Sequence, residues 1–200
     1  MPRPARFDDD TIIDATAAVV AASGPAGATV ARIARRIGAP TGSIYHRFRS
    51  RDVLLGEVWL NAVADFQAAF RRRLERDDPF QAGLEAVLSV PERVRDKPGE
   101  ARILALYRSE EFRERHWPPA LRERAGTLRR DFEDGIAGFA GRLFAGTGEE
   151  ALKLARFALA EAPLAAVRSH VQRNEPPPAV VDAIIEATYR SVVTLGRKLS

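Results

Sequence analysis

Residues 29–52 constrain this chain more than any other stretch, and they read TVARIARRIGAPTGSIYHRFRSRD. Thr29 can cap a helix, because its hydroxyl can accept a hydrogen bond from an unpaired backbone N–H. Apolar residues then recur at helical spacing up to Gly38, which can end the helix at positive φ. Pro40 suits the first turn of a second helix, since it has no N–H to donate and a preset φ. The stretch therefore predicts two short helices joined by a tight glycine turn.

The second of these helices is expected to run from about residue 40 to 48. It would bury Ile44 and Phe48, and Ser50 would stop it and cap a third helix. It would expose Thr41, Gly42, Ser43, Tyr45, His46 and Arg47. A small residue where the helices cross, a turn glycine and an apolar anchor are what a helix-turn-helix needs. In that unit the second helix enters the major groove of DNA.

Positive charge gathers in the same stretch. Residues 28–52 contain six arginines, one aspartate and no lysine, a local charge of +5, while the whole chain carries +4. Neutralisation of phosphates supplies most of the sequence-independent affinity for DNA, so this concentration favours a DNA-binding surface. On charge and spacing alone, an ordinary helical hairpin with a solvated basic face stays open as the alternative.

The residues of this stretch also resemble a known signature. The segment GSIYHRFRSRDVLL is similar to the signature of the TetR family of bacterial transcription regulators, carried by Gly42, Ser43, Ile44, Tyr45, Phe48, Ser50, Arg51 and Asp52. The resemblance continues upstream through Thr29, Ile33, Ala34 and Gly38, and covers about a quarter of the chain. Two departures are Pro40, where a serine is common, and Thr41, where a lysine is common. They affect the expected helix start and base preference, not the family.

This resemblance implies a DNA contact surface with two kinds of residues. The candidates for base edges lie on the second helix and are Thr41, Ser43 and Arg47, with Gly42 in the same exposed turn. The candidates for phosphates are Thr29, Arg32, Tyr45, His46 and Arg51. Two such helices would enter successive major grooves of a palindromic operator, roughly 34–36 Å apart.

The rest of the chain predicts an all-α fold of about nine helices, with no strand pattern of any length. We expect a three-helix head with the DNA-binding helix-turn-helix at residues 1–52 (the motif itself at about 29–48) and a helical ligand-binding and dimerisation domain at residues 53–200. A helix over residues 51–76 would link the two. The absence of cysteine, of an apolar leader and of any long apolar run suits a cytoplasmic protein.

The last two predicted helices, residues 149–173 and 179–198, are rich in alanine, and Pro163 should kink the first of them. Small side chains let helices approach closely. As in TetR-like proteins, we interpret this pair as half of a four-helix homodimer interface. Packing within one chain only is the alternative.

A small apolar effector would bind among the body helices. The candidate lining residues are mostly aromatic or aliphatic: Phe66, Leu88, Leu104, Tyr107, Trp117, Phe132 and Phe157, with Glu161 as a possible pocket carboxylate. Each apolar one would serve equally as plain core, and Glu161 equally as a surface residue. Catalytic motifs, metal-ligand spacings and cofactor motifs are missing from the sequence, so neither an enzyme nor a cofactor is expected.

These observations favour a dimeric, ligand-responsive transcription regulator, with repression as the expected mode and release by the effector. The alternative from a different class is a helical protein- or metabolite-binding module whose basic hairpin has no DNA role. A steep loss of affinity for duplex DNA with salt would separate the two.

Overall fold

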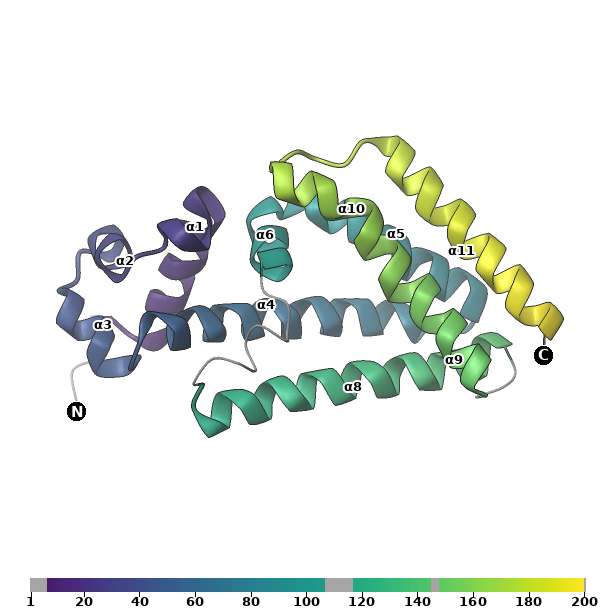
Figure 1. Cartoon of the computed structure of the whole chain (residues 1–200), viewed down its shortest axis with the longest axis horizontal. Helices are drawn as coiled ribbons and strands as arrows, with labels where there is room; N and C mark the ends of the chain where they lie inside the picture. Colours follow the sequence, from purple (N-terminus) through teal and green to yellow (C-terminus); the bar gives the residue numbers. More distant parts are fainter. Residues whose placement is uncertain (1–6, 107–116, 145–147, 200) are drawn as a thin grey trace. The chain divides into compact units, whose positions relative to one another are not determined.

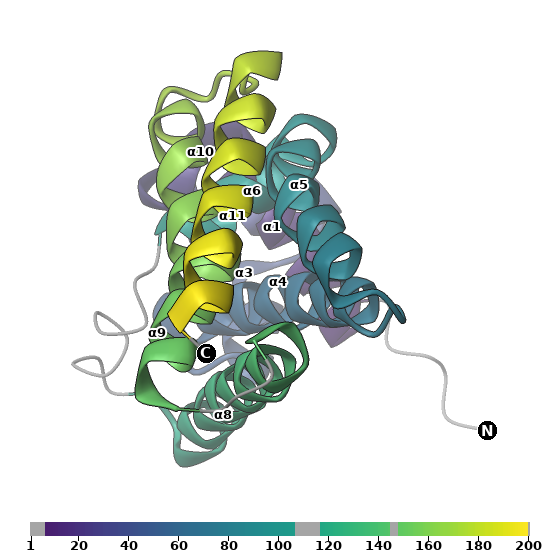
Figure 2. The same ribbon diagram turned by 90° about the vertical axis from the view of Figure 1, so that its right-hand side faces the viewer.

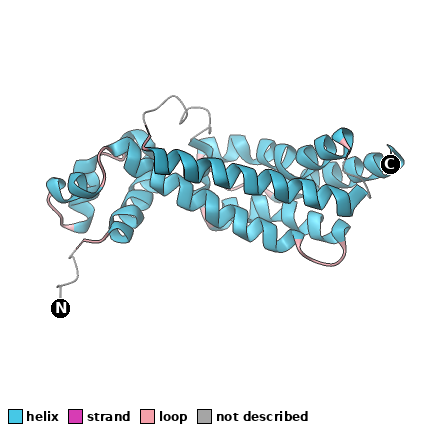
Figure 3. Cartoon of the chain, turned by 90° about the horizontal axis from the view of Figure 1, so that it is seen from below, coloured by secondary structure: helices cyan, strands magenta, loops and turns pink. Residues whose placement is uncertain are grey.

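The computed structural model describes residues 7–106, 117–144 and 148–199, and within these residues it contains helices and no strand (Figures 1 and 3). The amino-terminal helices are α1 (Asp9–Gly27), α2 (Val30–Ile37), α3 (Thr41–Arg47) and α4 (Arg51–Leu74). The others are α5 (Pro79–Asp96), α6 (Pro98–Leu106), α8 (Pro119–Phe144), α9 (Glu149–Arg156), the π-helical turn η1 (Phe157–Glu161), α10 (Ala162–Arg173) and α11 (Ala179–Leu199). The predicted all-α class is confirmed.

The chain divides into two compact units. The first comprises Met1–Val63 with Gly99–Gly126, and the second comprises Ala64–Pro98 with Thr127–Ser200. Helices α4 and α8 each contribute residues to both units. The domain boundary expected after residue 52 stays a prediction.

In the first unit, α1 is stabilised by a capped amino-terminal end and by a buried apolar stripe. The carboxylate of Asp8 accepts a hydrogen bond from the Thr11 N–H at 2.8 Å and so caps the helix. The stripe predicted from the sequence is buried, as Ile12, Ala15, Thr16, Val19 and Val20. Helix α6 belongs to the same unit, and its Arg102 donates to the carbonyl of Ala21 at 2.7 Å. The head is therefore supported by a helix about 80 residues away in sequence.

In the second unit, α11 lies along α5 and α10 (Figures 1 and 2). Tyr189 is fully buried and its hydroxyl donates to the carbonyl of Phe80 at 3.1 Å, over Gly83, where a β-carbon would collide with the phenol. Arg95 forms two hydrogen bonds of 2.8 Å to the carboxylate of Asp182. These contacts hold one side of α11 against the body.

The interruption predicted at Pro163 takes the form of a π-helical turn. Helices α9 and α10 are joined by η1, where the N–H of Ala162 donates to the carbonyl of Phe157, five residues back. Because Pro163 has no N–H, it cannot donate the usual α-helical hydrogen bond to the carbonyl of Leu159. The wider π-helical turn accommodates the loss of that hydrogen bond.

Candidate nucleic-acid interface and effector site

The helix-turn-helix predicted from the sequence is present, with the expected cap and turn. The hydroxyl of Thr29 accepts from the Arg32 N–H at 3.3 Å at the start of α2. Gly38 adopts φ 68° and ψ 29°, a left-handed conformation that a side chain disfavours, and it ends α2. Ile33 and Ala34 are buried between the helices. The turn therefore fixes how α3 leaves α2.

Helix α3 begins one residue later than expected. Pro40 lies just before the helix in an extended conformation (φ −64°, ψ 142°), because its ring allows that geometry as readily as a helical one. Ile44 is 1% exposed and Phe48 is 6% exposed, so both serve as the predicted anchors. The opposite side is open to solvent, with Ser43 half-buried and exposed positions at Thr41, Gly42, Tyr45, His46 and Arg47. This exposed side is the candidate DNA-reading surface.

All three predicted DNA-contacting arginines already have partners within the head. Arg32 donates to the carbonyl of Gly27 at 3.4 Å. Arg47 donates to the carboxylate of Asp9 at the start of α1. Arg51 donates through Nε to the carbonyl of Ala28 at 2.8 Å, and through a second nitrogen to the carbonyl of Pro25. Arg51 thus fastens the end of α1 to the start of α4, a structural task that the sequence reasoning missed. Its phosphate contact stays a prediction, as do those of the exposed Thr29 and Arg32.

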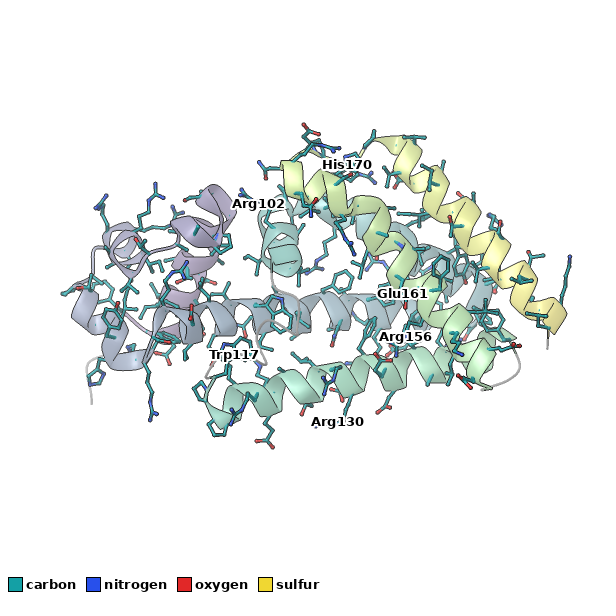
Figure 4. All side chains as sticks on the ribbon, in the orientation of Figure 1. Arg102, Trp117, Arg130, Arg156, Glu161 and His170 are labelled. Atoms are coloured by element: carbon teal, nitrogen blue, oxygen red, sulfur yellow. The ribbon has the colours of Figure 1, made fainter. Side chains whose placement is uncertain are left out.

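The candidate effector residues are distributed over both compact units. Phe66 and Phe132 come together around Phe70, with ring centroids 5.8 and 6.3 Å from that ring. Leu88 and Leu104 are half-buried, and Trp117, labelled in Figure 4, is buried against Trp59 in the first unit. Tyr107 lies outside the described residues.

The remaining two candidates face solvent in the single chain. Phe157 is 43% exposed, and Glu161, labelled in Figure 4, is exposed as well. Both belong to η1, where the π-helical turn changes the face that each residue presents. The 3.6-residue spacing used to place them on an inner face does not hold across such a turn, so no role as a pocket lining follows from this chain alone.

The second unit contains a cavity of about 160 Å³ that includes Phe66. Its lining combines aromatic and charged side chains: Phe66, Ala69, Phe70, Arg73, Ser89, Glu92, Arg93, Asp96 and Lys97. The guanidinium of Arg93 lies 5.8 Å from the centre of the Phe66 ring, within cation–π range. The sequence reasoning missed the charged part, although Arg73 shares a helix face with Phe66 and Phe70 at spacings of seven and three.

Comparison with known proteins agrees with this geometry. Residues 12–58 match the sequence model described as "Bacterial regulatory proteins, tetR family". The match covers the helix-turn-helix, so the amino-terminal part of the chain is similar to that of TetR-family regulators. No protein with a curated description matches the chain significantly by sequence.

Solved structures extend the likeness in fold to most of the chain. FadR from Bacillus subtilis, solved in complex with stearoyl-CoA, has a TM-score of 0.68 at 17% identity, with 91% of this chain and 98% of that chain covered. FadR from Bacillus halodurans has a TM-score of 0.66 at 16% identity, with 93% and 98% covered. The TetR-family regulator PfmR from Thermus thermophilus has a TM-score of 0.65 at 18% identity, with 92% and 97% covered. At these identities the likeness shows the fold.

TetR-family proteins are transcription regulators rather than enzymes; they bind DNA and small molecules and act as dimers. None of the helices described in this chain is both long and apolar enough to span a membrane.

Most of the exposed large apolar residues that the structure describes lie in the last helices. Among the described residues, Tyr45 on α3 is the one exposed large apolar side chain outside the segment from η1 to the end of α11. The others are Phe157, Leu164, Val180, Ile184, Leu195 and Leu199. We call these six the apolar face. Contiguous exposed apolar patches are typical of surfaces that bind partners.

Proposed function

We propose that this chain is a dimeric, ligand-responsive transcription regulator of the TetR family, and that it binds a palindromic DNA operator. The observation that carries the proposal is the exposed side of α3, which is held by a capped helix, a left-handed glycine and two buried anchors. The +5 charge of residues 28–52 matches the phosphate backbone. A helix so presented suits insertion in the major groove.

The proposed contacts divide by the chemistry that each side chain offers. Thr41, Ser43 and Arg47, with Gly42 beside them, would approach base edges. The phosphates would be bound by Thr29, Arg32, Tyr45, His46 and Arg51. In this arrangement Tyr45 positions the helix on any duplex, whereas Ser43 helps to choose the sequence.

A homodimer through α10 and α11 would present two copies of α3. The apolar face supports this assembly, because its side chains lose unfavourable contact with water when a second copy covers them. A two-fold dimer reads two half-sites that are inverted relative to each other and roughly 34–36 Å apart. The expected operator is therefore an inverted repeat.

The effector would bind in the helical body and release DNA. The cavity beside Phe66 supports a small ligand with an apolar part, and the similar Bacillus subtilis FadR was solved in complex with stearoyl-CoA. Leu88, Leu104, Trp117 and Phe132 stay as predicted lining residues. Release requires that the ligand bind the state with separated heads better than the DNA-competent state. We further propose that the chain represses transcription in the absence of the effector and that it is located in the cytoplasm.

Selection of bound duplexes from a random DNA pool tests this function. The purified chain should enrich inverted repeats whose half-sites are centred about one helical turn apart. Enrichment should disappear as salt rises, because phosphate contacts contribute much of the affinity. If nothing is enriched and the chain ignores duplex DNA even at low salt, the helical binding module without a DNA role becomes the better description.

A further inference from the structure

The acidic first turn of α1 meets the carboxyl end of the recognition helix. Arg47, the last residue of α3, donates from Nη1 to Oδ1 of Asp9 at 2.5 Å, across 38 residues of sequence. The Arg47 side chain is 30% exposed and that of Asp9 is 58% exposed. The pair is therefore open to solvent and to any ligand that approaches the end of α3.

The neighbouring carboxylates differ in what they do. Asp8 caps α1, and its hydrogen bonds to Thr11 lower the pKa of the Asp8 carboxyl, with a further contribution from the charge of Arg47. Asp10 is exposed, and within the described part of the chain it forms neither a hydrogen bond nor an ion pair. Asp9 is thus the carboxylate of this turn that holds the guanidinium directly.

On a duplex of arbitrary sequence, which offers Arg47 no matching base edge, a phosphate would have to compete for that guanidinium. When an arginine is paired with a carboxylate, some of its N–H donors are already in use. DNA can bind that arginine only if a phosphate replaces the carboxylate. The carboxylate released by that exchange would still lie near the negatively charged duplex. Both effects oppose binding, and neither depends on the sequence of the duplex.

We propose that Asp9 is an internal competitor for Arg47, which lowers the affinity of the chain for arbitrary duplex DNA. The inference rests on the proposed function, because it assigns a regulatory role to a contact of the same DNA-reading helix. An exposed pair of this kind has a modest strength, so the expected change on its removal is about two- to fivefold in affinity.

Three single variants and two double variants test whether Asp9 competes with DNA for Arg47. The measurement is fluorescence anisotropy with a labelled duplex of arbitrary sequence, over a series of salt concentrations. Asp9→Asn should bind about two- to fivefold more tightly at low salt. The slope of log affinity against log salt should become steeper by about 0.9, the value for one additional phosphate contact. Asp10→Asn is the matched control, since it removes the same charge from the same turn; its gain should be smaller and its slope unchanged.

The two double variants separate competition for Arg47 from a general effect of charge. In an Arg47→Gln background, Asp9→Asn should give no larger gain than Asp10→Asn, because no guanidinium remains to be freed. Thermal unfolding followed by circular dichroism verifies that each variant is folded. The inference is overturned if Asp9→Asn binds more weakly, if it matches Asp10→Asn, or if its gain persists without Arg47. Wild-type chain that binds no duplex would overturn the proposed function as well, so the two failures are distinguishable.

Discussion

Helices α3 and α11 both present one side to solvent, but the two exposed sides have opposite chemistry. On α3 the apolar residues Ile44 and Phe48 are buried, and the exposed side is polar and basic apart from Tyr45. On α11 one side is buried around Tyr189, and the other still exposes Val180 and Ile184. A charged side suits a charged partner, while an apolar side suits a second protein surface. Under the proposed function, the two surfaces would bind their partners through different driving forces.

Salt should separate these two surfaces most strongly. If the two heads together make about six phosphate contacts, the affinity for duplex DNA should fall about a thousandfold between roughly 50 and 200 mM salt. Over the same range the dimer dissociation constant should change by less than about twofold, because burial of apolar groups depends weakly on ionic strength. Anisotropy and sedimentation equilibrium measure the two quantities. If the dimer dissociation constant rose with salt as steeply as that of the DNA complex, the proposed difference between the two surfaces would be wrong.

A charge on the apolar face should have the next largest effect. Ile184→Glu places a carboxylate where burial is proposed, and the dimer dissociation constant should rise by at least about a hundredfold. Size-exclusion chromatography with light scattering measures the change. Gln81→Glu is the control, because it adds the same charge at an exposed position on α5 and should leave the dimer intact. An unchanged dimer in Ile184→Glu would exclude the interface proposed here.

The DNA-reading side can be tested by two conservative changes on α3. Tyr45→Phe removes one hydroxyl and should weaken binding to all duplexes alike by about fivefold, the loss expected for one hydrogen bond to phosphate. Ser43→Ala should change the order of preferred operators more than the mean affinity. Duplex selection followed by titration measures both outcomes. If neither variant changes operator binding, the assignment of exposed residues on α3 to DNA is wrong.

The buried side of α11 should show the smallest effect, and it should depend on pH. Arg95 holds the pKa of the Asp182 carboxyl below its ordinary value of 3.8, chiefly through their hydrogen bonds. Because the folded pKa is the lower one, the stabilisation is present above about pH 4 and is lost as pH falls through the folded pKa. Asp182→Asn should therefore destabilise the chain at pH 7 by about 1 kcal/mol or less, as expected for a partly exposed pair.

Thermal unfolding at pH 7 and at successively lower pH measures this difference. The gap in unfolding midpoint between wild type and Asp182→Asn should close in acid. Asp65→Asn is the control, because Asp65 is exposed and forms no ion pair with any residue that the structure describes. A gap that persists unchanged to the lowest pH would mean that the Asp182 charge does not stabilise the fold.

The features predicted correctly from the sequence are the local ones. Thr29 caps α2, Gly38 ends it and Ile44 anchors α3, and each of these roles is decided within a few residues of chain. The periodic burial of residues along α1 was predicted from helical spacing in the same way.

The candidate sites were less predictable because they depend on contacts between distant residues. Arg51 was assigned to phosphate, but it also binds carbonyls 23 and 26 residues away. Phe66 and Phe132 do meet, through Phe70, whereas Phe157 lies in a π-helical turn that helical spacing does not anticipate. Each of these outcomes follows from how helices pack, and a single-sequence pattern contains no direct information on that.

The sequence by itself determined the helical class, the turn of the helix-turn-helix and the place where positive charge gathers, because backbone preference and hydrophobic period act over short distances. Only the tertiary structure decided which arginines are already engaged, which aromatic rings share a cavity and which side of α11 remains uncovered. Those outcomes depend on the packing of segments 20 to 110 residues apart, as between Arg51 and Ala28 or Tyr189 and Phe80. The free energy of packing belongs to the whole arrangement of helices rather than to any one of them.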